Sequence, residues 1–366
     1  AHRGGRGPRR ERSKGVTMFK RAGMVFFYTL TPLHPGSGAS VTAVDLPIQR
    51  ERHTNYPMIQ ASGVKGALRD LADQLRKANQ LGNDKEAEQK IEIVFGPKTE
   101  AASEHGGALS LTDARILLFP VRSAKGVFTW ITCPGVIARL KRDLKIVKAT
   151  NGNADDQALQ EIDLPALDPK ARHASTPQDS GIVLENDQII LEDFCFVLPQ
   201  DAKRDQVGRL AKWLAENAFP SGLNYWRDKL KKDLVLLGDD DFRDFVEMST
   251  EVITRVKLGE KGTVETGPWD EEHLPSETLL YSLALATDPK FKEEDLKDKP
   301  IKDAQDVLNF LKNELASKAV MQFGGDETVG KGLVWVRYFE AGEKLADREP
   351  SRKAEAMAAG GEEHAN

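Results

Sequence analysis

Met24-Val25-Phe26-Phe27-Tyr28-Thr29-Leu30-Thr31 is the stretch from which the fold of this chain can first be read. Its β-branched and aromatic residues favour an extended strand. The next residues, Pro32-Leu33-His34-Pro35-Gly36-Ser37-Gly38-Ala39-Ser40, include two prolines and two glycines, which disfavour regular structure. The sequence therefore predicts a strand over residues 24–31 that runs into a loop long enough to reach a neighbouring element.

Two segments downstream predict a loop that leads into a helix. The first is Val44-Asp45-Leu46-Pro47-Ile48-Gln49-Arg50-Glu51-Arg52-His53-Thr54. The second begins at Ser62-Gly63, and its apolar residues at 64, 67, 68, 71 and 75 follow helical spacing, with Ser62 as the predicted N-cap. The first turn of a helix leaves backbone N–H groups unpaired at the positive end of the helix dipole. That end suits a phosphate group.

A glycine-rich stretch lies near the C-terminus and reads Gly324-Gly325-Asp326-Glu327-Thr328-Val329-Gly330-Lys331-Gly332. From Gly325 it matches GxxxxGK, the start of a Walker A motif, but Gly332 stands where that motif needs Ser or Thr. A strand-like run over residues 333–339 follows, whereas a P-loop leads into a helix. The pattern favours a loop that exposes its backbone to an extended phosphodiester. A glycine-rich turn without chemical function is the alternative.

The overall charge is moderately negative. The 366 residues include 52 Lys plus Arg and 57 Asp plus Glu, for a net charge of −5. Proteins that coat nucleic acid indiscriminately need a strongly basic field, so this average argues against a histone-like protein. With 40% hydrophobic and 30% charged residues, the chain has the composition of an ordinary globular protein and not of a disordered or membrane-embedded one.

Positive charge is nevertheless concentrated in two segments. Residues 1–17 carry six basic side chains against Glu11, and we expect a disordered arm that either contacts nucleic acid or is an extension ahead of Met18. Residues 121–150 carry seven basic side chains against Asp143. This run is either a groove for nucleic acid or the solvated face of a helix.

The compartment is indicated by the cysteines and the first apolar run. A basic start at Met18 followed by apolar residues resembles a signal peptide, but Thr29, Thr31 and Pro32 interrupt the run and favour a strand. Cys133 and Cys195 lie too far apart to form a CxxC or zinc motif. Two such thiols fit a reducing cytosol, so we expect a cytoplasmic protein without a membrane segment.

The remaining segments predict alternating helices and strands. A hairpin is expected over 182–197 with its turn at 185–187, either as a projecting wedge or as an ordinary sheet edge. Asp239-Asp240-Asp241 is either a metal-binding cluster or, as the helical spacing that follows favours, the first turn of a helix. We further expect helices over 76–92, 203–217, 224–232 and 302–318, strands over 109–120, 252–258 and 278–286, and polar excursions over 151–180 and 341–366.

Three of these stretches together carry a family resemblance. Residues 29–38, residues 44–54 with 62–69, and residues 323–332 occur in an order that closely resembles the repeated backbone subunits of type III-B CRISPR (Cmr) complexes, within the RAMP superfamily. The resemblance covers residues 18 to about 340. It implies an α+β fold with an RRM-like (ferredoxin-like) core, forming one domain over 18–340 with large insertions. It also implies a thumb β-hairpin, which we place within residues 150–197.

The resemblance implies a function in which copies of the subunit stack along a guide RNA beside other Cmr subunits. The thumb interrupts the guide–target duplex at regular intervals, and an acid in the loop after the first strand cleaves the target RNA. That acid is Asp45 here. The RNA-contacting positions implied by the match are Arg50, Arg52, Ser62, Gly63, Lys65, Arg69, Gly325, Gly330 and Lys331.

The chemistry of RNA cleavage gives these residues definite tasks. The neighbouring 2′-OH must lose its proton, the attack must be in line, and the leaving 5′-oxygen must be neutralised. Asp45 would act as the general base or as a ligand for a divalent ion, Mg²⁺ or Mn²⁺. Four residues are candidate assistants: His34, Glu271, Glu272 and His273. Taken alone, an Asp before Leu-Pro is more often a turn residue.

Two other functions stay open from the sequence. One is a structural RNA-binding subunit whose acid takes no part in cleavage. The other is a nucleotide-dependent enzyme that uses the glycine loop, which Gly332 disfavours.

Overall fold

The computed structural model describes residues 18–39, 44–97, 106–152, 157–220, 222–291, 299–318 and 320–340. Its helices are α1 (Ala61–Lys77), α2 (Asp84–Phe95), α3 (Pro134–Asn151), α4 (Gln157–Gln160), α5 (Arg204–Asn217), α6 (Asn224–Asp233), α7 (Asp239–Met248), α9 (Ala304–Asn309) with its π-helical continuation η2 (Phe310–Leu315), and the 3₁₀ turn η3 (Glu327–Val329). Its strands are β1 (Arg21–Thr29), β2 (Met58–Ile59), β3 (Leu109–Leu111), β4 (Ala114–Ser123), β5 (Val127–Thr132), β6 (Gln188–Leu191), β7 (Phe194–Val197), β8 (Leu234–Leu236), β9 (Glu251–Leu258), β10 (Val264–His273), β11 (Leu279–Ala286), β12 (Val320–Gln322) and β13 (Leu333–Phe339).

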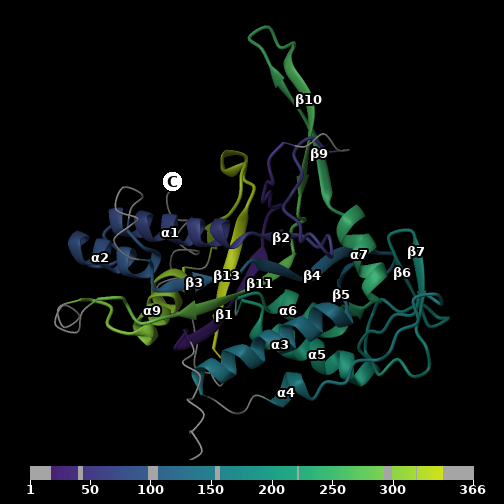
Figure 1. The fold of residues 1–366 in the computed structure, drawn as a ribbon. Helices are drawn as coiled ribbons and strands as arrows, with labels where there is room; N and C mark the ends of the chain where they lie inside the picture. The colour runs from purple at the N-terminus through teal and green to yellow at the C-terminus, as the bar shows by residue number, and fades with distance from the viewer. Residues whose placement is uncertain are drawn as a thin grey trace, which may run out of the picture.

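A large, mostly antiparallel sheet forms the centre of the molecule (Figure 1). Its strand order is β12-β13-β1-β11-β4-β5-β8. Strand β1 pairs antiparallel with both β13 and β11, and β11 pairs antiparallel with β4, whereas β5 and β8 run parallel. The predicted mixture of helices with a β-sheet is confirmed at this level.

Strand β1 lies in the hydrophobic core with both of its faces covered. Residues 22–29 are all buried, because successive side chains point to opposite faces and each face meets packed aromatics. The Tyr28 ring lies 4.9 Å from that of Phe219, and the Phe27 ring lies 5.3 Å from that of Phe323. Burying each such side chain contributes about 1.5–3 kcal/mol. The strand predicted at 24–31 is therefore present, and it ends at Thr29 before the loop that holds His34.

Strands β9 and β10 form a separate two-stranded sheet that projects beyond the rest of the molecule (Figure 1). Their outer halves are exposed, whereas residues 271–273 at the end of β10 are buried. The predicted strand at 252–258 is confirmed as β9, and the acidic segment after it, which the sequence left without a predicted structure, is β10. The hairpin therefore has a solvated tip and a base anchored in the body.

The hairpin predicted over 182–197 is present as β6–β7, but its turn lies at Glu192–Asp193 and not at 185–187. Glu192 adopts a left-handed conformation with φ +50°, which the tight connection requires. The pair Leu191–Ser123 joins this hairpin to β4 of the main sheet. The β6–β7 hairpin is therefore an ordinary sheet edge and not a projecting wedge.

Two expectations about the first helices were wrong. The single helix predicted over 76–92 is broken, because α1 ends at Lys77 and α2 begins at Asp84, capped by the Asn83 side chain. Ser62 is not the N-cap of α1. The helix begins at Ala61 after Gln60, and the Asp113 carboxylate accepts a hydrogen bond of 2.8 Å from the Ala61 N–H.

Other expectations are confirmed or bounded more closely. Helices α5, α6 and α9 with η2 correspond to the predicted helices, β11 corresponds to the strand at 278–286, and Asp239 to Asp241 form the first turn of α7. The predicted excursion at 151–180 is not wholly solvated, because Ser175 is fully buried and pairs with Leu236.

The predicted arm at 1–17, loop residues 40–43 and the tail at 341–366 lie outside the described residues. Among the helices that the structure describes, none has the length and apolar character needed to cross a membrane.

Candidate functional site

The loop that carries Asp45 is fastened to the base of the β9–β10 hairpin. Leu46 forms a bridge with Glu271, its N–H donates to the Asp270 carbonyl, and its carbonyl accepts from the Glu272 N–H, both at 3.0 Å. Asp45 is exposed, and its Oδ2 accepts a hydrogen bond of 2.9 Å from the Asp270 N–H. Its Oδ1 has no hydrogen-bond partner among the described residues, so this oxygen is available to a substrate.

His34 is held next to the same strand. Its Nδ1 lies 2.6 Å from the carbonyl oxygen of Glu272. A carbonyl oxygen can only accept, so Nδ1 carries the proton and Nε2 of the neutral ring has a free lone pair. A Cβ at Gly36 would lie 2.7 Å from Nε2, so only glycine leaves room for this ring position. The His34 and His273 rings are 5.4 Å apart.

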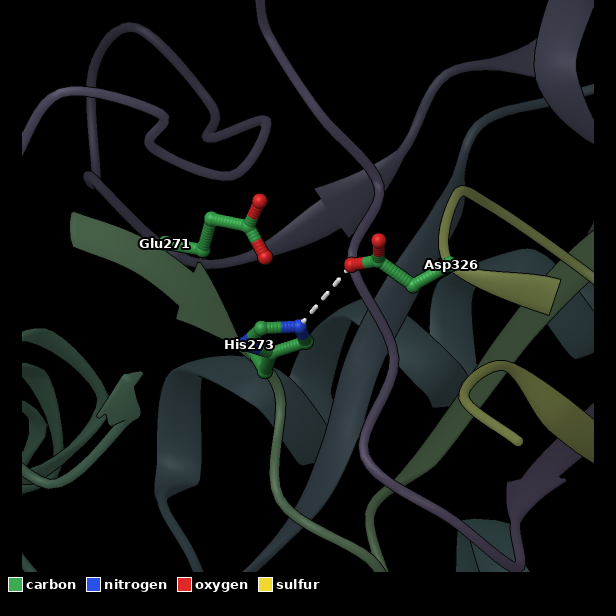
Figure 2. A group of neighbouring side chains, drawn as sticks. All are labelled: Glu271, His273 and Asp326. Carbon is green, nitrogen blue, oxygen red and sulfur yellow. Dashed lines mark hydrogen bonds and ion pairs between the residues drawn. The ribbon is translucent and has the colours of Figure 1, made fainter. Parts of the chain in front are cut away.

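Glu271, His273 and Asp326 converge from two separate elements, as Figure 2 shows. One possible ligand atom from each lies within 4.8 Å of the others, and His273 Nε2 is 3.3 Å from Asp326 Oδ2. Arg255 of β9 bridges the two acids, with Nε 2.8 Å from Glu271 Oε2 and Nη1 3.1 Å from Asp326 Oδ1. Trp269 Nε1 donates to Glu271 Oε1 at 2.9 Å. This cluster links the hairpin base to the glycine loop.

The environment shifts the protonation of two members of the cluster. Burial lowers the pKa of His273, and the Asp326 carboxylate only partly offsets that effect. Burial acts to raise the pKa of Asp326, but the Arg255 guanidinium and His273 outweigh it, so this pKa lies below its usual range. At neutral pH the cluster therefore combines a neutral imidazole with an ionised Asp326.

The glycine loop over residues 324–332 packs against the loop that carries His34. A Cβ at Gly324 would lie 2.4 Å from the His34 carbonyl oxygen, and the Gly325 N–H donates to that oxygen at 3.1 Å. Gly330 is exposed with φ +76°. The Lys331 ammonium forms no ion pair or hydrogen bond with the described residues, so it can meet an incoming phosphate.

Arg50 and Arg52, two of the three arginines predicted to contact RNA, differ in availability. Arg50 is bound inside the protein, with Nη2 2.5 Å from Glu272 Oε1 and Nη1 donating to the carbonyls of Asn55 and Val246 at 2.9 and 3.0 Å. It holds the Asp45 loop against the body. Arg52 is exposed and makes no side-chain bond to the described part of the chain. Of the two, Arg52 can reach RNA without breaking an internal ion pair.

The start of α1 offers backbone groups more than side chains. Ser62 and Gly63 are exposed in the first turn, and their N–H groups have no acceptor among the described residues. Lys65 Nζ donates to the Leu109 carbonyl at 3.0 Å, and burial, followed by the nearby charge of Arg69, lowers its pKa. Arg69 points to the Pro97 carbonyl at 3.4 Å. The side chains of Lys65 and Arg69 thus contact the backbone at Leu109 and Pro97 and not Asp45.

The basic run at 121–150 does not form one groove. Arg139 pairs with the buried Glu51 at 2.6 Å. Arg142 pairs with Asp143 at 2.8 Å. Arg122 lies in β4 and Lys125 in the turn before β5, and the other basic residues lie in α3. Lys125 and Lys141 donate to backbone carbonyls, so not all of these charges are available to RNA.

Arg255 and Asp326 are the site residues that the sequence did not assign a role. Arg255 lies in β9 between Thr254 and Val256, on the less exposed face of the strand, where a charge was a weak signal. Asp326 belonged to a loop selected for its glycines and lysine. Their pairing depends on how the hairpin and the loop meet, which no local pattern contains.

Comparisons with known proteins agree on one family. The family model described as the RAMP superfamily matches residues 26–335. The chain is 40% identical over 318 residues to the CRISPR system Cmr endoribonuclease Cmr4 of Pyrococcus furiosus, covering 86% of this chain and 95% of that protein. It is 26% identical to the CRISPR system CMR subunit Cmr4 of Saccharolobus solfataricus, covering 86% and 95%.

Solved structures show the same fold. The crystal structure of oligomeric Cmr4 from Pyrococcus furiosus has a TM-score of 0.60 at 33% identity and covers 88% of this chain and 99% of that one. A chain in the cryo-EM structure of a type III-B Cmr-beta complex bound to cognate target RNA has a TM-score of 0.64 at 22% identity, covering 88% and 98%, and supports the fold alone.

Proposed function

The chain belongs to the RAMP superfamily, and from this premise we propose that it is the backbone subunit of a type III-B CRISPR effector complex, which binds guide RNA and cleaves paired target RNA. The relative at 40% identity, named a Cmr endoribonuclease, supports this over nearly its whole length. The observation that carries the proposal is the meeting of Asp45, His34, the end of β10 and the glycine loop at the foot of one projecting hairpin.

The order of the central strands supports an RRM-like core within a single domain over 18–340. Strands β13, β1, β11 and β4 are neighbours in that order, and each adjacent pair is antiparallel. Along the chain, α1 lies between β1 and β4, and α9 lies between β11 and β13. A β-α-β-β-α-β order with the last strand beside the first is the ferredoxin-like arrangement. The other elements are then insertions into it.

The β9–β10 hairpin is the better supported thumb. The sequence placed the thumb within 150–197, but the hairpin in that segment is joined to the main sheet through Leu191. The β9–β10 hairpin projects freely and carries exposed apolar residues at Val252, Val256 and Leu258 (Figure 1). Apolar side chains on a projecting element are suited to wedging between stacked bases. Asp45 at its base would then face the nucleotide that the wedge displaces.

Asp45 and His34 divide the proton transfers. Displacing a nucleotide frees the target strand from duplex geometry, so the 2′-OH can attack the adjacent phosphorus in line. The open Asp45 Oδ1 takes the 2′-OH proton as general base. His34 in its protonated form gives its Nε2 proton to the leaving 5′-oxygen as general acid, because Nδ1 is held by the Glu272 carbonyl, so the P–O5′ bond breaks as the P–O2′ bond forms. The open amides of Ser62 and Gly63 and the Lys331 ammonium hold guide phosphates.

A divalent ion is compatible with Asp45 as its protein ligand. The residue brings one open carboxylate oxygen, and its other oxygen is held by the Asp270 N–H, which fixes the carboxylate in place. Mg²⁺ or Mn²⁺ bound by one carboxylate together with RNA phosphates is a usual arrangement. Such an ion would neutralise charge on the leaving oxygen.

The test is Asp45→Asn in the complex assembled with a guide RNA. Asparagine keeps an oxygen that can accept from the Asp270 N–H, so the loop should hold its place. We expect cutting of a complementary RNA to fall by about 10²-fold or more, with guide and target affinities unchanged. Gel analysis of the cut products and filter binding measure the two properties.

Asp193→Asn is the matched control, because Asp193 lies in the turn between β6 and β7 and not at the base of the β9–β10 hairpin. Unchanged cutting by Asp45→Asn would assign the chain to the other class, a structural guide-binding subunit. Loss of RNA affinity together with cutting would instead show that Asp45 acts in binding.

A further inference from the structure

We infer that Glu271, His273 and Asp326 form a binding site for one divalent transition-metal ion, which joins the hairpin base to the glycine loop (Figure 2). This site differs from the Asp45 position, where any ion would be shared with RNA. The inference concerns the protein alone and does not depend on the proposed cleavage of RNA.

The geometry of the three side chains fits a common ion. Ligand atoms held about 2.0–2.2 Å from a metal lie roughly 3–4.4 Å apart. His273 Nε2 and Asp326 Oδ2 are 3.3 Å apart, and the widest separation in the group is below 4.8 Å. An adjustment of less than about 1 Å closes the set. Figure 2 shows the three side chains pointing toward one shared space.

The burial of the ligands favours binding over hydration. Glu271 and His273 are 6% and 0% exposed, whereas the side chain of Asp326 is 20% exposed. Two ligands are thus withdrawn from water on the rigid end of β10, and the third lies at the surface and gives the ion a path of entry. Ligands fixed on a strand lose little freedom when they coordinate an ion.

Arg255 acts here as an outer partner of the ligands. It contacts Asp326 through Oδ1, which leaves Oδ2 facing His273. On Glu271, Arg255 and Trp269 each bond one oxygen. A carboxylate oxygen has two lone-pair positions, so each bonded oxygen can still bind an ion. Partners of this kind orient metal ligands. Arg255 offsets one of the two carboxylate charges, and the Lys331 ammonium adds a longer-range positive charge near His273.

The donor set selects the class of metal. Carboxylates alone suit Mg²⁺ and Ca²⁺, whereas an imidazole suits first-row transition metals such as Zn²⁺. One imidazole with two carboxylates therefore favours Mn²⁺ or Zn²⁺ over Mg²⁺. Of these two, Zn²⁺ should bind more tightly, following the usual order of affinities.

Mn²⁺ titration of the full-length chain, stripped of metal and free of RNA, tests the site. The paramagnetic resonance signal of free Mn²⁺ reports how much is bound. We expect one Mn²⁺ per chain, displaced by Zn²⁺ but not by an equal concentration of Mg²⁺. Asp326→Asn should weaken binding by more than the roughly 10- to 100-fold that loss of an outer partner costs. Asp326 lies on a surface loop, so this variant should fold.

Glu327→Gln is the matched control, since it removes one negative charge from the neighbouring exposed position without removing a ligand. It should bind Mn²⁺ as the parent does. The inference is overturned if the parent chain binds no Mn²⁺, if Asp326→Asn binds it equally well, or if Asp45→Asn abolishes the binding instead. Because no RNA is present, none of these results bears on whether the assembled complex cuts its target.

Discussion

At the scale of single residues, the structure separates basic side chains that look equivalent in the sequence. Lys65 and Lys331 both lie in segments suited to phosphate. Lys65 donates to a backbone carbonyl and is partly buried, whereas the Lys331 ammonium forms no hydrogen bond or ion pair with the described residues and interacts with Glu251 only at longer range. A phosphate must displace an existing contact to reach Lys65 but not to reach Lys331. Accessibility, and not residue type, ranks their contributions to RNA binding.

Lys331→Ala should weaken guide RNA binding for every guide sequence and reduce the magnitude of the salt slope by about 1. Lys65→Ala should have a smaller effect, because its ammonium already serves the Leu109 carbonyl. Filter binding over a series of salt concentrations measures both. Lys212→Ala, at an exposed position of α5, serves as control. A change in base preference with an unaltered salt slope would contradict a phosphate contact.

At the scale of elements, the glycine loop shows why the Walker-like match ends as it does. Gly332 has φ +77°, its N–H donates to the Pro32 carbonyl at 2.9 Å, and a Cβ there would lie 2.0 Å from the Phe323 carbonyl oxygen. A Ser or Thr at this position cannot fit. A P-loop has a Ser or Thr that binds magnesium at this position. Here the path of the backbone between β12 and β13 requires Gly332 instead.

Gly332→Ala and Gly330→Ala form a matched pair for this loop. Both glycines have left-handed φ values, but a Cβ at Gly330 meets nothing within 4 Å. We expect Gly330→Ala to lower the free energy of unfolding by about 1 kcal/mol, and Gly332→Ala by about 2–4 kcal/mol, because the second adds a backbone clash. Urea unfolding measures both. Equal losses would show that the close approach at Gly332 is not needed.

At the scale of the whole molecule, charge is organised by pairing. The buried Glu51 is bound by Arg139 and Arg115, and Asp143 by Arg142 and the Tyr281 hydroxyl. Charges used in this way hold the body together and leave little for RNA. The net charge of −5 is therefore compatible with guided RNA binding at a few open positions.

Folding stability should respond to pH through Glu277. Burial raises the pKa of its carboxyl to about 7. An acid with a raised pKa favours the folded state when protonated, so this contribution is complete below its ordinary pKa and is lost as pH rises through 7. From pH 5 to pH 8, the free energy of unfolding of Glu277→Gln should therefore fall by about 1 kcal/mol less than that of the parent. This value is reduced to allow for solvent screening of a partly exposed carboxyl.

Urea unfolding at the two pH values measures this difference. Glu260→Gln, at the exposed turn of the β9–β10 hairpin, provides the control and should follow the parent at both. If the stability of the parent and of Glu277→Gln falls equally, ionisation of the Glu277 carboxyl does not destabilise the folded protein, and the prediction is wrong.

Local pattern was enough for much of the fold. The β-rich run before Pro32 predicted β1, and helical spacing predicted α5, α6 and the acidic first turn of α7. It was not enough where partners are distant. Ser62 looked like an N-cap, but the α1 N-terminus is instead bonded by Asp113, 52 residues away. The long break between α1 and α2 and the shift of the β6–β7 turn arise from packing in the same way.

By itself, the sequence predicted many of the strands and helices, because propensity and periodicity are local properties. Asp45, His34, Glu271 and His273 were selected through the family resemblance, which rests on motif order. Only the tertiary structure decided that Arg255 and Asp326 join them, that Arg50 is an internal ion pair, and that β9–β10 is the hairpin that projects. Those outcomes depend on distances between residues far apart in the chain. Such distances are fixed when the sheet and the hairpin base pack together.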